Sequence, residues 1–313
     1  MANECNEAVR IAFDAVKAIT KNERAIHVAF LLAGIAILAY VLTTISIADI
    51  ISAFSMLGSS MGILAVILIL VLAIRSLRLK LLMKRLADVS FFNVFKIVFE
   101  TALFAIYSPG KAGEVTKLDL FKKYGISRTQ SMSAIIVERV YDLVVVTVLS
   151  AGMLISLGVD MLFVLVGGTA AVVLAAALYK SNVFGGLFTK MFDSMKMFLN
   201  VKSVATMLVL TIVLWLADAS AMYFVLRMLG HDVRLDILVP VYFASTIIGL
   251  VSMIPGGLGA SEFSFSYALT AMAGVPAADA MATMLASRVV TFLVCSVGSV
   301  LYFVEMRGVI RNG

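Results

Sequence analysis

Residues 109–114 read PGKAGE, and residues 255–262 read PGGLGASE. Each Pro-Gly pair interrupts a long apolar stretch, and a glutamate follows it, Glu114 in the first copy and Glu262 in the second. Proline removes a backbone N–H and glycine is a weak helix former, so both residues end helices. The two copies therefore predict one helix–break–helix unit in each half of the chain.

The composition of the 313-residue chain decides its class. Hydrophobic residues make up 62% of it and charged residues only 14%, whereas about a quarter of the residues in soluble domains are charged. Apolar runs of about 18 residues or more recur along the sequence, which is typical of membrane-spanning helices. We therefore predict an all-α polytopic membrane protein with a single membrane domain over residues 1–313.

The basic residues report topology rather than nucleic-acid binding. The net charge is +6, and in membrane proteins lysine and arginine concentrate on the cytoplasmic side. Residues 1–24 mix acids and bases with spaced apolar residues, which favours a helix on the membrane surface over a cleaved signal peptide. Cys5 lies in this polar segment and Cys295 in an apolar run, so we expect no disulfide between them.

Nine apolar runs can be placed against these charges. Six of them predict about six transmembrane helices, at 25–46, 58–77, 131–157, 161–179, 203–227 and 279–304. The other three belong to the broken units, so residues 91–124 and residues 237–274 each predict a re-entrant helical hairpin. This arrangement puts most basic residues, with Arg75, Arg78 and Lys117 among them, in cytoplasmic segments, and it places both termini in the cytoplasm.

The two halves follow the same order from opposite sides. Residues 25–157 read helix, helix, hairpin, helix from the cytoplasm, and residues 161–304 read the same from outside. Pro-Gly-x-x-Gly occurs in both hairpins, and an arginine precedes a valine in both closing helices, at Arg139 and Arg288. Matching motifs, order and topology predict an inverted repeat, the architecture of many secondary transporters. Chance similarity between apolar sequences is the alternative.

Charged residues inside the apolar runs mark candidate functional positions. Each costs about 2.5–3.5 kcal/mol at the bilayer centre on insertion scales. Glu138, Arg139 and Asp142 share one predicted helix, and Arg288 lies at a similar depth in the second half. Asp218 lies deep in another run, where we expect it to line the same cavity. A structural salt bridge is the alternative for Arg139 and Asp142, because their i,i+3 spacing lets them pair.

The hairpin tips offer a second kind of binding group. A helix that starts after Pro-Gly points free backbone N–H groups into the membrane interior, which favours an anion such as phosphate. Lys111 adds a cation, and Glu114 and Glu262 offer carboxylates for an amine or a hydroxyl. Helix capping is the alternative role of the two glutamates. The glycines that permit close backbone approach are Gly110, Gly113, Gly256, Gly257 and Gly259.

Four stretches together resemble one known family. YSPGKAGEVTKL, IIVERVYDLVVV, MIPGGLGASE and SRVV, in this order, are similar to the membrane domain of lysylphosphatidylglycerol synthases, a family often labelled flippase-like. The resemblance covers essentially the whole chain, and it implies two re-entrant hairpins and movement of a polar-headgroup lipid between leaflets. The family's motif residues fall on Pro109, Gly110, Gly113, Glu114, Glu138, Arg139, Asp142, Pro255, Gly256, Gly257, Gly259, Glu262 and Arg288.

One departure from the family limits what the resemblance implies. Bifunctional members carry a soluble aminoacyl-transferase domain after the membrane domain, and no such segment follows here before Gly313. The resemblance therefore implies a stand-alone membrane domain and does not imply lysyl transfer.

The sequence predicts a lipid flippase or scramblase of a prokaryotic plasma membrane. The expected ligand is a membrane lipid with a phosphate-containing head group, either a phospholipid or an aminoacyl- or glyco-lipid, held in a midplane cavity between the hairpins. The predicted binding residues are the family's motif residues together with Lys111 and Asp218. Transport would be downhill or ion-coupled, because no nucleotide-binding motif is present.

Other classes of function stay open at this point. The main alternative is a non-transporting membrane subunit that anchors lipid, or presents it, to a synthase or glycosyltransferase. A membrane-embedded enzyme is the least favoured class, because no nucleophile–base pair or metal-ligand cluster stands out in the sequence. We therefore expect no catalytic residues, cofactor or metal. A homo-oligomer and a separate lipid-modifying enzyme stay open as partners.

Overall fold

The computed structural model describes residues 57–108, 113–156, 201–252 and 254–312, with four further positions between 48 and 55. All regular secondary structure in these ranges is helical. The elements are η1 (Gly58–Ser60), α3 (Met61–Met83), α4 (Phe91–Tyr107), α5 (Thr116–Lys122), α6 (Arg128–Ser156), α9 (Val201–Met228), α10 (Leu235–Val251), η3 (Pro255–Gly257), α11 (Ala260–Ala273) and α12 (Ala277–Asn312). The predicted surface helix at 1–24, the predicted spans at 25–46 and 161–179, and the tip residues 109–112 lie outside the described residues.

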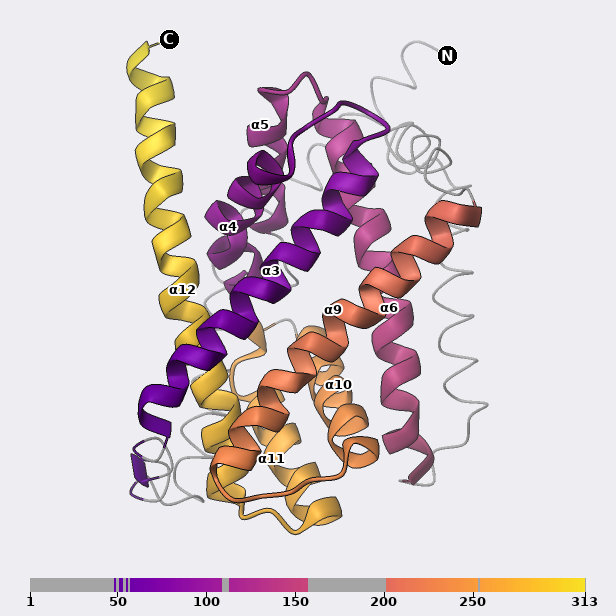
Figure 1. Cartoon of the computed structure of the whole chain (residues 1–313), viewed down its shortest axis with the longest axis vertical. Coiled ribbons are helices and arrows are strands. Elements are labelled where there is room, and N and C mark those ends of the chain that lie inside the picture. The colour runs from indigo at the N-terminus through magenta and orange to yellow at the C-terminus, as the bar shows by residue number, and fades with distance from the viewer. Residues whose placement is uncertain are drawn as a thin grey trace, which may run out of the picture.

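In the described ranges, the long helices α3, α6, α9 and α12 run between two broken helical units, and one unit lies at each end (Figure 1). α3 and α12 run toward the end that holds α4 and α5, which we call the upper end. α6 and α9 run the opposite way, toward the lower end, which holds α10 and α11. The four helices α3, α6, α9 and α12 therefore form two antiparallel sets between two broken units.

Three of the long helices are apolar enough to cross a membrane. They are α3, residues 202–228 of α9 and residues 277–302 of α12. α6 is long enough at 29 residues, but charged side chains interrupt its apolar sequence. α4 and α10 have 17 residues each, which makes them about 26 Å long and shorter than a ~30 Å hydrocarbon core. The number of spans and the re-entrant course of the broken units stay predictions.

The broken units exchange partners across the two halves. α4 packs along α12, and α10 packs along α6, so each unit contacts the closing helix of the other half. α3 and α9 also pack on each other. Gly298 of α12 lies so near α4 that a Cβ there would fall 2.2 Å from the Phe99 carbonyl oxygen. Small residues allow such close helix packing in membranes, where apolar burial alone does not drive association.

Local chemistry explains where the two units break. In the first unit, Ser108 ends α4 and its hydroxyl accepts the Gly113 N–H at 2.6 Å. A side chain at Gly113 would place Cβ 2.0 Å from the Phe104 carbonyl oxygen. In the second unit, Gly256 has φ +65°, a left-handed conformation that favours glycine. In the second break Gly257 also permits close approach, since a Cβ there would lie 2.8 Å from the Gly249 Cα. Both breaks therefore need glycine for close approach, and the second needs it for backbone conformation as well.

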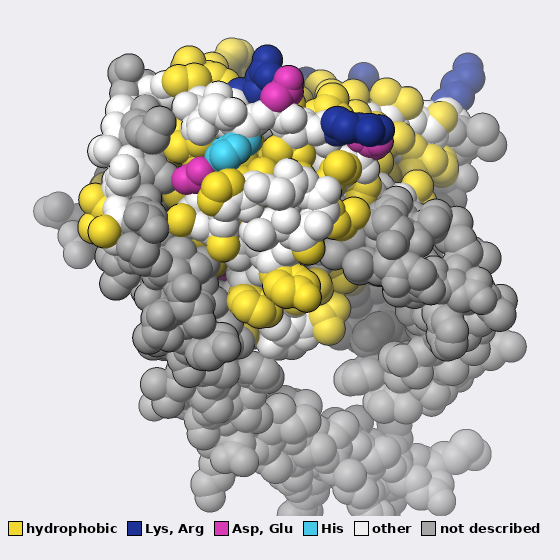
Figure 2. All heavy atoms as spheres, turned by 90° about the horizontal axis from the view of Figure 1, so that it is seen from below, with side chains coloured by type: hydrophobic (Ala, Val, Ile, Leu, Met, Phe, Trp, Pro, Cys, Tyr) yellow, Lys and Arg dark blue, Asp and Glu magenta, His cyan; other side chains and the backbone are white. Residues whose placement is uncertain are grey.

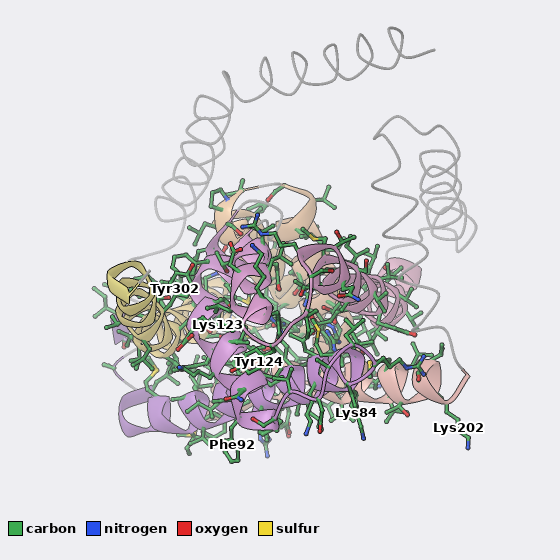
Figure 3. All side chains as sticks on the ribbon, turned by 90° about the horizontal axis from the view of Figure 1, so that it is seen from above. Lys84, Phe92, Lys123, Tyr124, Lys202 and Tyr302 are labelled. Atoms are coloured by element: carbon green, nitrogen blue, oxygen red, sulfur yellow. The ribbon has the colours of Figure 1, made fainter. Side chains whose placement is uncertain are left out.

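The two ends of the molecule differ in charge. Lys84, Lys123 and Lys202 come from three separate segments and lie at the upper end (Figures 1 and 3). At the lower end, Arg227 pairs with Asp232 at 2.7 Å, and Arg234 pairs with Asp236 at 2.6 Å. Figure 2 looks onto this lower end, where uncharged side chains cover most of the described surface. The basic excess therefore lies at the upper end.

Candidate functional site

Arg78 is the centre of a charged cluster inside the protein. Its side chain, on α3, is fully buried. The guanidinium donates to Glu138 Oε1 at 2.7 Å and to Asp142 Oδ1 at 2.6 Å, both on α6. It also donates to Thr211 Oγ1 of α9 at 2.9 Å. Because Glu138 and Asp142 are four residues apart, they share one face of α6 and one arginine can hold both. Arg78 thereby joins three long helices.

Arg139 extends this cluster to the first broken unit. Its Nη1 lies 2.7 Å from Asp142 Oδ2, and its Nη2 lies 3.3 Å from Glu138 Oε2. The same Nη2 lies 3.6 Å from Glu114 Oε1, just after the break. Glu114 in turn forms a close ion pair with Lys117 of α5. Arg139 therefore connects the second arm of the broken unit to α6.

We call these side chains the first charge network. Its members are Arg78, Lys117, Arg139, Glu114, Glu138 and Asp142. Three cations oppose three carboxylates, and apart from Arg139 their side chains are at most 7% exposed. Removing one partner of a buried pair leaves an uncompensated charge, which costs about 3–5 kcal/mol. The charges of the network therefore balance only when all six side chains are present, and the loss of any one of them should destabilise the fold.

Arg288 of α12 forms a second arginine site with the other broken unit. It donates from Nη1 to the Gly256 carbonyl oxygen at 2.7 Å and from Nη2 to Ser261 Oγ at 2.7 Å. Its Nε makes a close ion pair with Glu262 Oε1. The other carboxylate oxygen, Glu262 Oε2, accepts the Gly259 N–H at 2.8 Å. Glu262 thus caps α11 and neutralises Arg288 at the same time.

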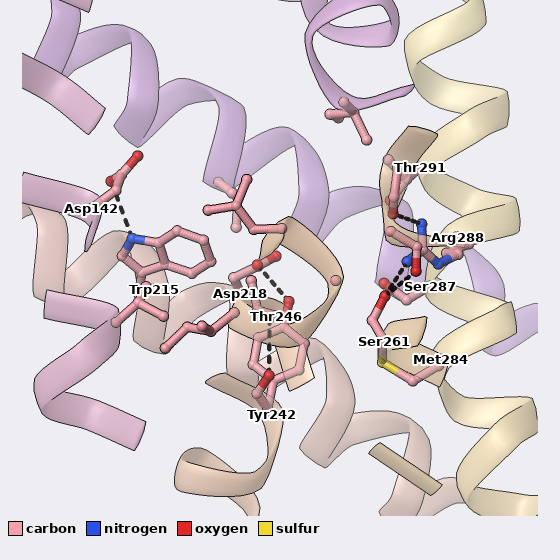
Figure 4. Close-up of a pocket in the computed structure, with 18 of the residues that line it drawn as sticks. Asp142, Trp215, Asp218, Tyr242, Thr246, Ser261, Met284, Ser287, Arg288 and Thr291 are labelled. Carbon is pink, nitrogen blue, oxygen red and sulfur yellow. Dashed lines mark hydrogen bonds between the residues drawn. The ribbon is translucent and has the colours of Figure 1, made fainter. Parts of the chain in front are cut away.

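A cavity of about 420 Å³ lies between the first charge network and the second arginine site. Arg139 and Asp142 line it from the network, and Arg288 and Gly256 line it from the second site. Figure 4 shows Asp142 at one side of the cavity and Ser261 with Arg288 at the other. The volume falls within the range of small-molecule sites, about 300–1,000 Å³.

Aromatic side chains hold the carboxylates of the cavity wall. Trp215 Nε1 donates to Asp142 Oδ1 at 3.1 Å, and the Tyr242 hydroxyl donates to Asp218 Oδ2 at 2.7 Å (Figure 4). Trp215 is the single tryptophan of the chain. Much of the remaining wall is apolar and includes Leu68, Val71, Leu72, Ile106, Val146 and Met222. The cavity therefore combines apolar walls with groups of both charges.

Arg75 lines the same cavity and differs from the other arginines in it. It lies on α3, three residues before Arg78. Its Nε is buried without a hydrogen-bond partner, as are those of Arg139 and Arg288. Unlike theirs, its guanidinium forms no ion pair in the part of the chain that the structure describes. Arg75 is thus a cation at the cavity wall with no ion-pair partner among the described residues.

The sequence-predicted site residues separate into three groups. Those lining the cavity are Arg139, Asp142, Asp218, Gly256, Gly257 and Arg288. Glu114, Glu138, Gly259 and Glu262 lie behind them in the network or the second site. Gly113 and Pro255 belong to the two breaks and do not line the cavity. Pro109, Gly110 and Lys111 lie outside the described residues.

Arg75, Arg78 and Lys117 were counted among the basic residues of cytoplasmic segments, but the structure places them inside the protein. α3 continues to Met83, beyond the predicted end at 77, so Arg78 lies within the helix, as Arg75 already did in the predicted run. Arg78 and Lys117 are buried and ion-paired, and Arg75 lines the cavity. The signal was present, since apolar residues continue on both sides of Arg78 and no glycine or proline follows before 83. The topology prediction assigned basic residues to segments between the spans, and it therefore took these cations to be exposed to solvent.

No group of three or more His, Cys, Asp or Glu side chains in the described ranges is arranged to hold a metal ion. The charged groups at the cavity wall can instead bind a ligand through ion pairs and hydrogen bonds. Phosphate is the anion that arginine binds well, often through two parallel N–H donors. Carboxylates such as Asp142 and Asp218 suit amines and hydroxyls. The arrangement is therefore suited to binding a ligand that carries an anion together with an amine or hydroxyl.

Comparison with known proteins identifies relatives of this chain. Residues 26–298 match the family described as the lysylphosphatidylglycerol synthase TM region. Two UPF0104 membrane proteins of Methanothermobacter thermautotrophicus are each 26% identical, over 102 residues (32% of this chain, 30% of that protein) and 115 residues (36% and 34%). A UPF0104 membrane protein of Pyrococcus horikoshii is 25% identical over 249 residues, 66% of this chain and 74% of that protein. The match spans about a third of the first two relatives.

Proposed function

This chain belongs to the family of the lysylphosphatidylglycerol synthase TM region, and on that premise we propose that it is a flippase- or scramblase-like lipid transporter. Its substrate would be a membrane lipid with a phosphate-containing head group, which moves between leaflets while its acyl chains stay in the bilayer. The family's motif residues would form the path of the head group. The same proposal extends to the finer topology, with two re-entrant hairpins in an inverted repeat.

The cavity is the observation that carries this proposal. Its volume of about 420 Å³ suits a polar head group but not a whole phospholipid. Charges at its wall lie among apolar side chains, and the long helices around it expose apolar residues such as Val148, Leu293 and Val300. A charged head group crossing the bilayer needs such a polar site, because moving a charge into hydrocarbon is costly. An apolar exterior lets the acyl chains remain in lipid.

The packing of the two halves supports an alternating-access mechanism. Each broken unit contacts the closing helix of the other half. The cavity is lined by residues of both halves. In secondary transporters built from inverted repeats, the substrate site lies at the repeat interface and one half rocks against the other. The opposite directions of α3 and α9, and of α6 and α12, agree with that architecture (Figure 1).

The charge difference between the ends supports an orientation. The upper end carries Lys84, Lys123 and Lys202, whereas the arginines of the lower end are paired with aspartates. Basic residues favour the cytoplasmic side. We therefore assign the upper end, which includes the end of α12, to the cytoplasm of a prokaryotic cell.

Leaflet exchange in liposomes tests the proposal. Purified protein is reconstituted with a fluorescent phospholipid, and a membrane-impermeant reductant measures how much label reaches the outer leaflet. We expect exchange with the wild type and at least a tenfold slower rate with Ser287→Trp, which fills the cavity. The control is Val297→Trp on the same helix, whose side chain is 58% exposed and points away from the protein.

Two outcomes would contradict the transport proposal. No exchange above empty liposomes, for any head group tried, would remove transport and favour a non-transporting subunit that presents lipid to a synthase or glycosyltransferase. Equal exchange rates for Ser287→Trp, Val297→Trp and the wild type would show that the lipid does not pass through this cavity. A co-purifying enzyme at a fixed stoichiometry would be independent support for the subunit alternative.

A further inference from the structure

The arginines of the cavity are not equivalent, and their partners decide which of them can take a ligand. Arg139 contacts three carboxylates, those of Asp142, Glu138 and Glu114. A phosphate that approached Arg139 would meet these carboxylates and would have to displace one of them. The neutrality of the first charge network therefore disfavours Arg139 as the point where an anion binds.

Arg288 is committed in a similar way. All three nitrogens of its guanidinium have protein partners: Nη1 the Gly256 carbonyl, Nη2 the Ser261 hydroxyl and Nε the Glu262 carboxylate. These contacts also hold the second break and the start of α11 in place. An anion here would compete with the cap of a helix, so Arg288 is better suited to position the cavity wall than to bind ligand.

Arg75 has neither kind of partner among the described residues. Its Nε is buried at the cavity wall without an acceptor. A buried donor without an acceptor costs about 1–3 kcal/mol, and a charged one costs more, so a ligand that supplies the acceptor gains that energy. Guanidinium and phosphate match in geometry and charge. An anion at Arg75 would complete the hydrogen bonding of the wall.

The apolar side chains next to Arg75 point to the rest of the ligand. Leu68, Val71, Leu72 and Arg75 all line the cavity from α3. Their spacing of three, one and three residues puts them on a single stripe of the helix. Arg75 therefore lies at the upper end of an apolar stripe, where an anionic group attached to apolar atoms would contact both.

We propose that Arg75 is the anion anchor of this cavity and binds the phosphate of a lipid head group, whereas Arg139 and Arg288 are positioning residues. The proposal rests on the lipid-binding function proposed above. It differs from the expectation from the sequence, in which Arg139 and Arg288 were among the predicted binding residues and Arg75 was counted as a cytoplasmic cation. The proposal specifies only the phosphate of the lipid. The other side chains of the cavity wall would contact the rest of the head group.

The single tryptophan gives a direct probe of this site. Trp215 lines the cavity, so its fluorescence reports occupancy without a label. The full chain in uncharged detergent is titrated with short-chain phosphatidic acid, with short-chain diacylglycerol and with inorganic phosphate. We expect saturable binding of phosphatidic acid, with Arg75→Gln at least tenfold weaker. Arg75→Lys should be intermediate, because lysine keeps the charge but not the paired donors.

The control variant removes a cation from the same helix region but outside the cavity. Arg85 is exposed, follows α3 and donates to Ser203. Arg85→Gln should bind phosphatidic acid like the wild type. Arg75→Gln should also unfold close to the wild-type temperature, since it breaks no hydrogen bond or ion pair within the described ranges, and this separates a lost ligand site from a lost fold. Diacylglycerol binding, which has no phosphate, should not depend on residue 75.

The outcomes separate this inference from the transport proposal. Unchanged phosphatidic acid binding by Arg75→Gln overturns the assignment, even if the wild type exchanges lipid between leaflets. Arg75-dependent binding by a protein that exchanges no lipid supports the anchor and removes transport. If inorganic phosphate saturates the wild type at the same concentration as phosphatidic acid, the site is one for free phosphate and the lipid part is overturned.

Discussion

The first charge network and the second arginine site both neutralise an arginine beside a helix break, but they do so with different partners. In both, an arginine of a closing helix pairs with the glutamate that follows a Pro-Gly break, Arg139 with Glu114 and Arg288 with Glu262. The first pair is long, at 3.6 Å, and belongs to a set of six charged side chains from α3, the first broken unit and α6. The second pair is close and is completed by a backbone carbonyl and a serine hydroxyl.

This difference shows how each site depends on its parts. Every carboxylate in the network is shared, so the loss of one cation affects several partners at once. Glu262 has an independent partner in the Gly259 N–H, so it remains bonded when Arg288 is lost. The network should therefore respond to substitution more strongly than the second site, whose Arg288 side chain is 19% exposed although its Glu262 is buried.

Arg78→Gln should have the largest effect on stability. Glu138 and Asp142 each pair with Arg78 of α3 and with Arg139 of α6. Without Arg78, these two buried carboxylates share Arg139. We expect a loss of about 3–5 kcal/mol in the free energy of unfolding. Unfolding in mixed micelles with increasing SDS, followed by circular dichroism, measures this loss.

Arg75→Gln is the matched comparison for that variant, because it removes the same kind of side chain three residues earlier on the same helix. It should cost little or nothing, since Arg75 has no ion pair in the described ranges. Equal losses for Arg75→Gln and Arg78→Gln would show that the network does not stabilise the fold in the way described.

Arg288→Gln should have an intermediate effect. The variant loses the ion pair with Glu262 and two hydrogen bonds, but Glu262 keeps its bond to Gly259. We expect a loss of about 2 kcal/mol, the range for hydrogen bonds to a charged group. The same unfolding experiment on Arg288→Gln, Glu262→Gln and the double variant gives the coupling energy directly. Strictly additive losses would mean that the pair has no mutual stabilisation, and the comparison with the network would fail.

The sequence predicted the elements well because helix breaks and apolar runs are local signals. The predicted runs at 91–108, 203–227 and 260–274 correspond to α4, α9 and α11 within a few residues at each end. The family and the all-helical membrane class were confirmed in the same way, from motif and composition. The hairpins and the repeat stay predictions, because they concern the path through a bilayer.

The ion-pair partners of the arginines could not all be predicted from the sequence. Arg139 and Asp142 were expected to pair from their spacing, and they do. Arg78 is 60 residues from Glu138 and 133 from Thr211 along the chain, so no local pattern connects them. Arg288 had no acid near it in sequence, and its partner Glu262 became visible only when α11 and α12 were packed together. Long-range ion pairs depend on packing, which one sequence does not reveal.

The smallest effect on stability is expected for a solvent-exposed ion pair at the upper end. Arg128 donates to Asp119 Oδ1 at 2.6 and 2.9 Å, yet the two side chains are 61% and 46% exposed. The hydrogen bond from Arg128 lowers the pKa of Asp119. The pair therefore contributes stability above the unfolded pKa of aspartate, about 3.9, and loses it as pH falls through the lower pKa of the folded state.

Asp119→Asn should consequently change the free energy of unfolding by less than about 1 kcal/mol at neutral pH, because solvent screens exposed pairs. The difference from the wild type should shrink further at high salt and should disappear as pH falls through the lowered pKa of Asp119, where the carboxyl group is protonated in the folded as well as the unfolded state. The same SDS unfolding series measures it. A loss comparable with that of Arg78→Gln would contradict the premise that burial, rather than the number of ion pairs, separates the first charge network from the surface of the protein.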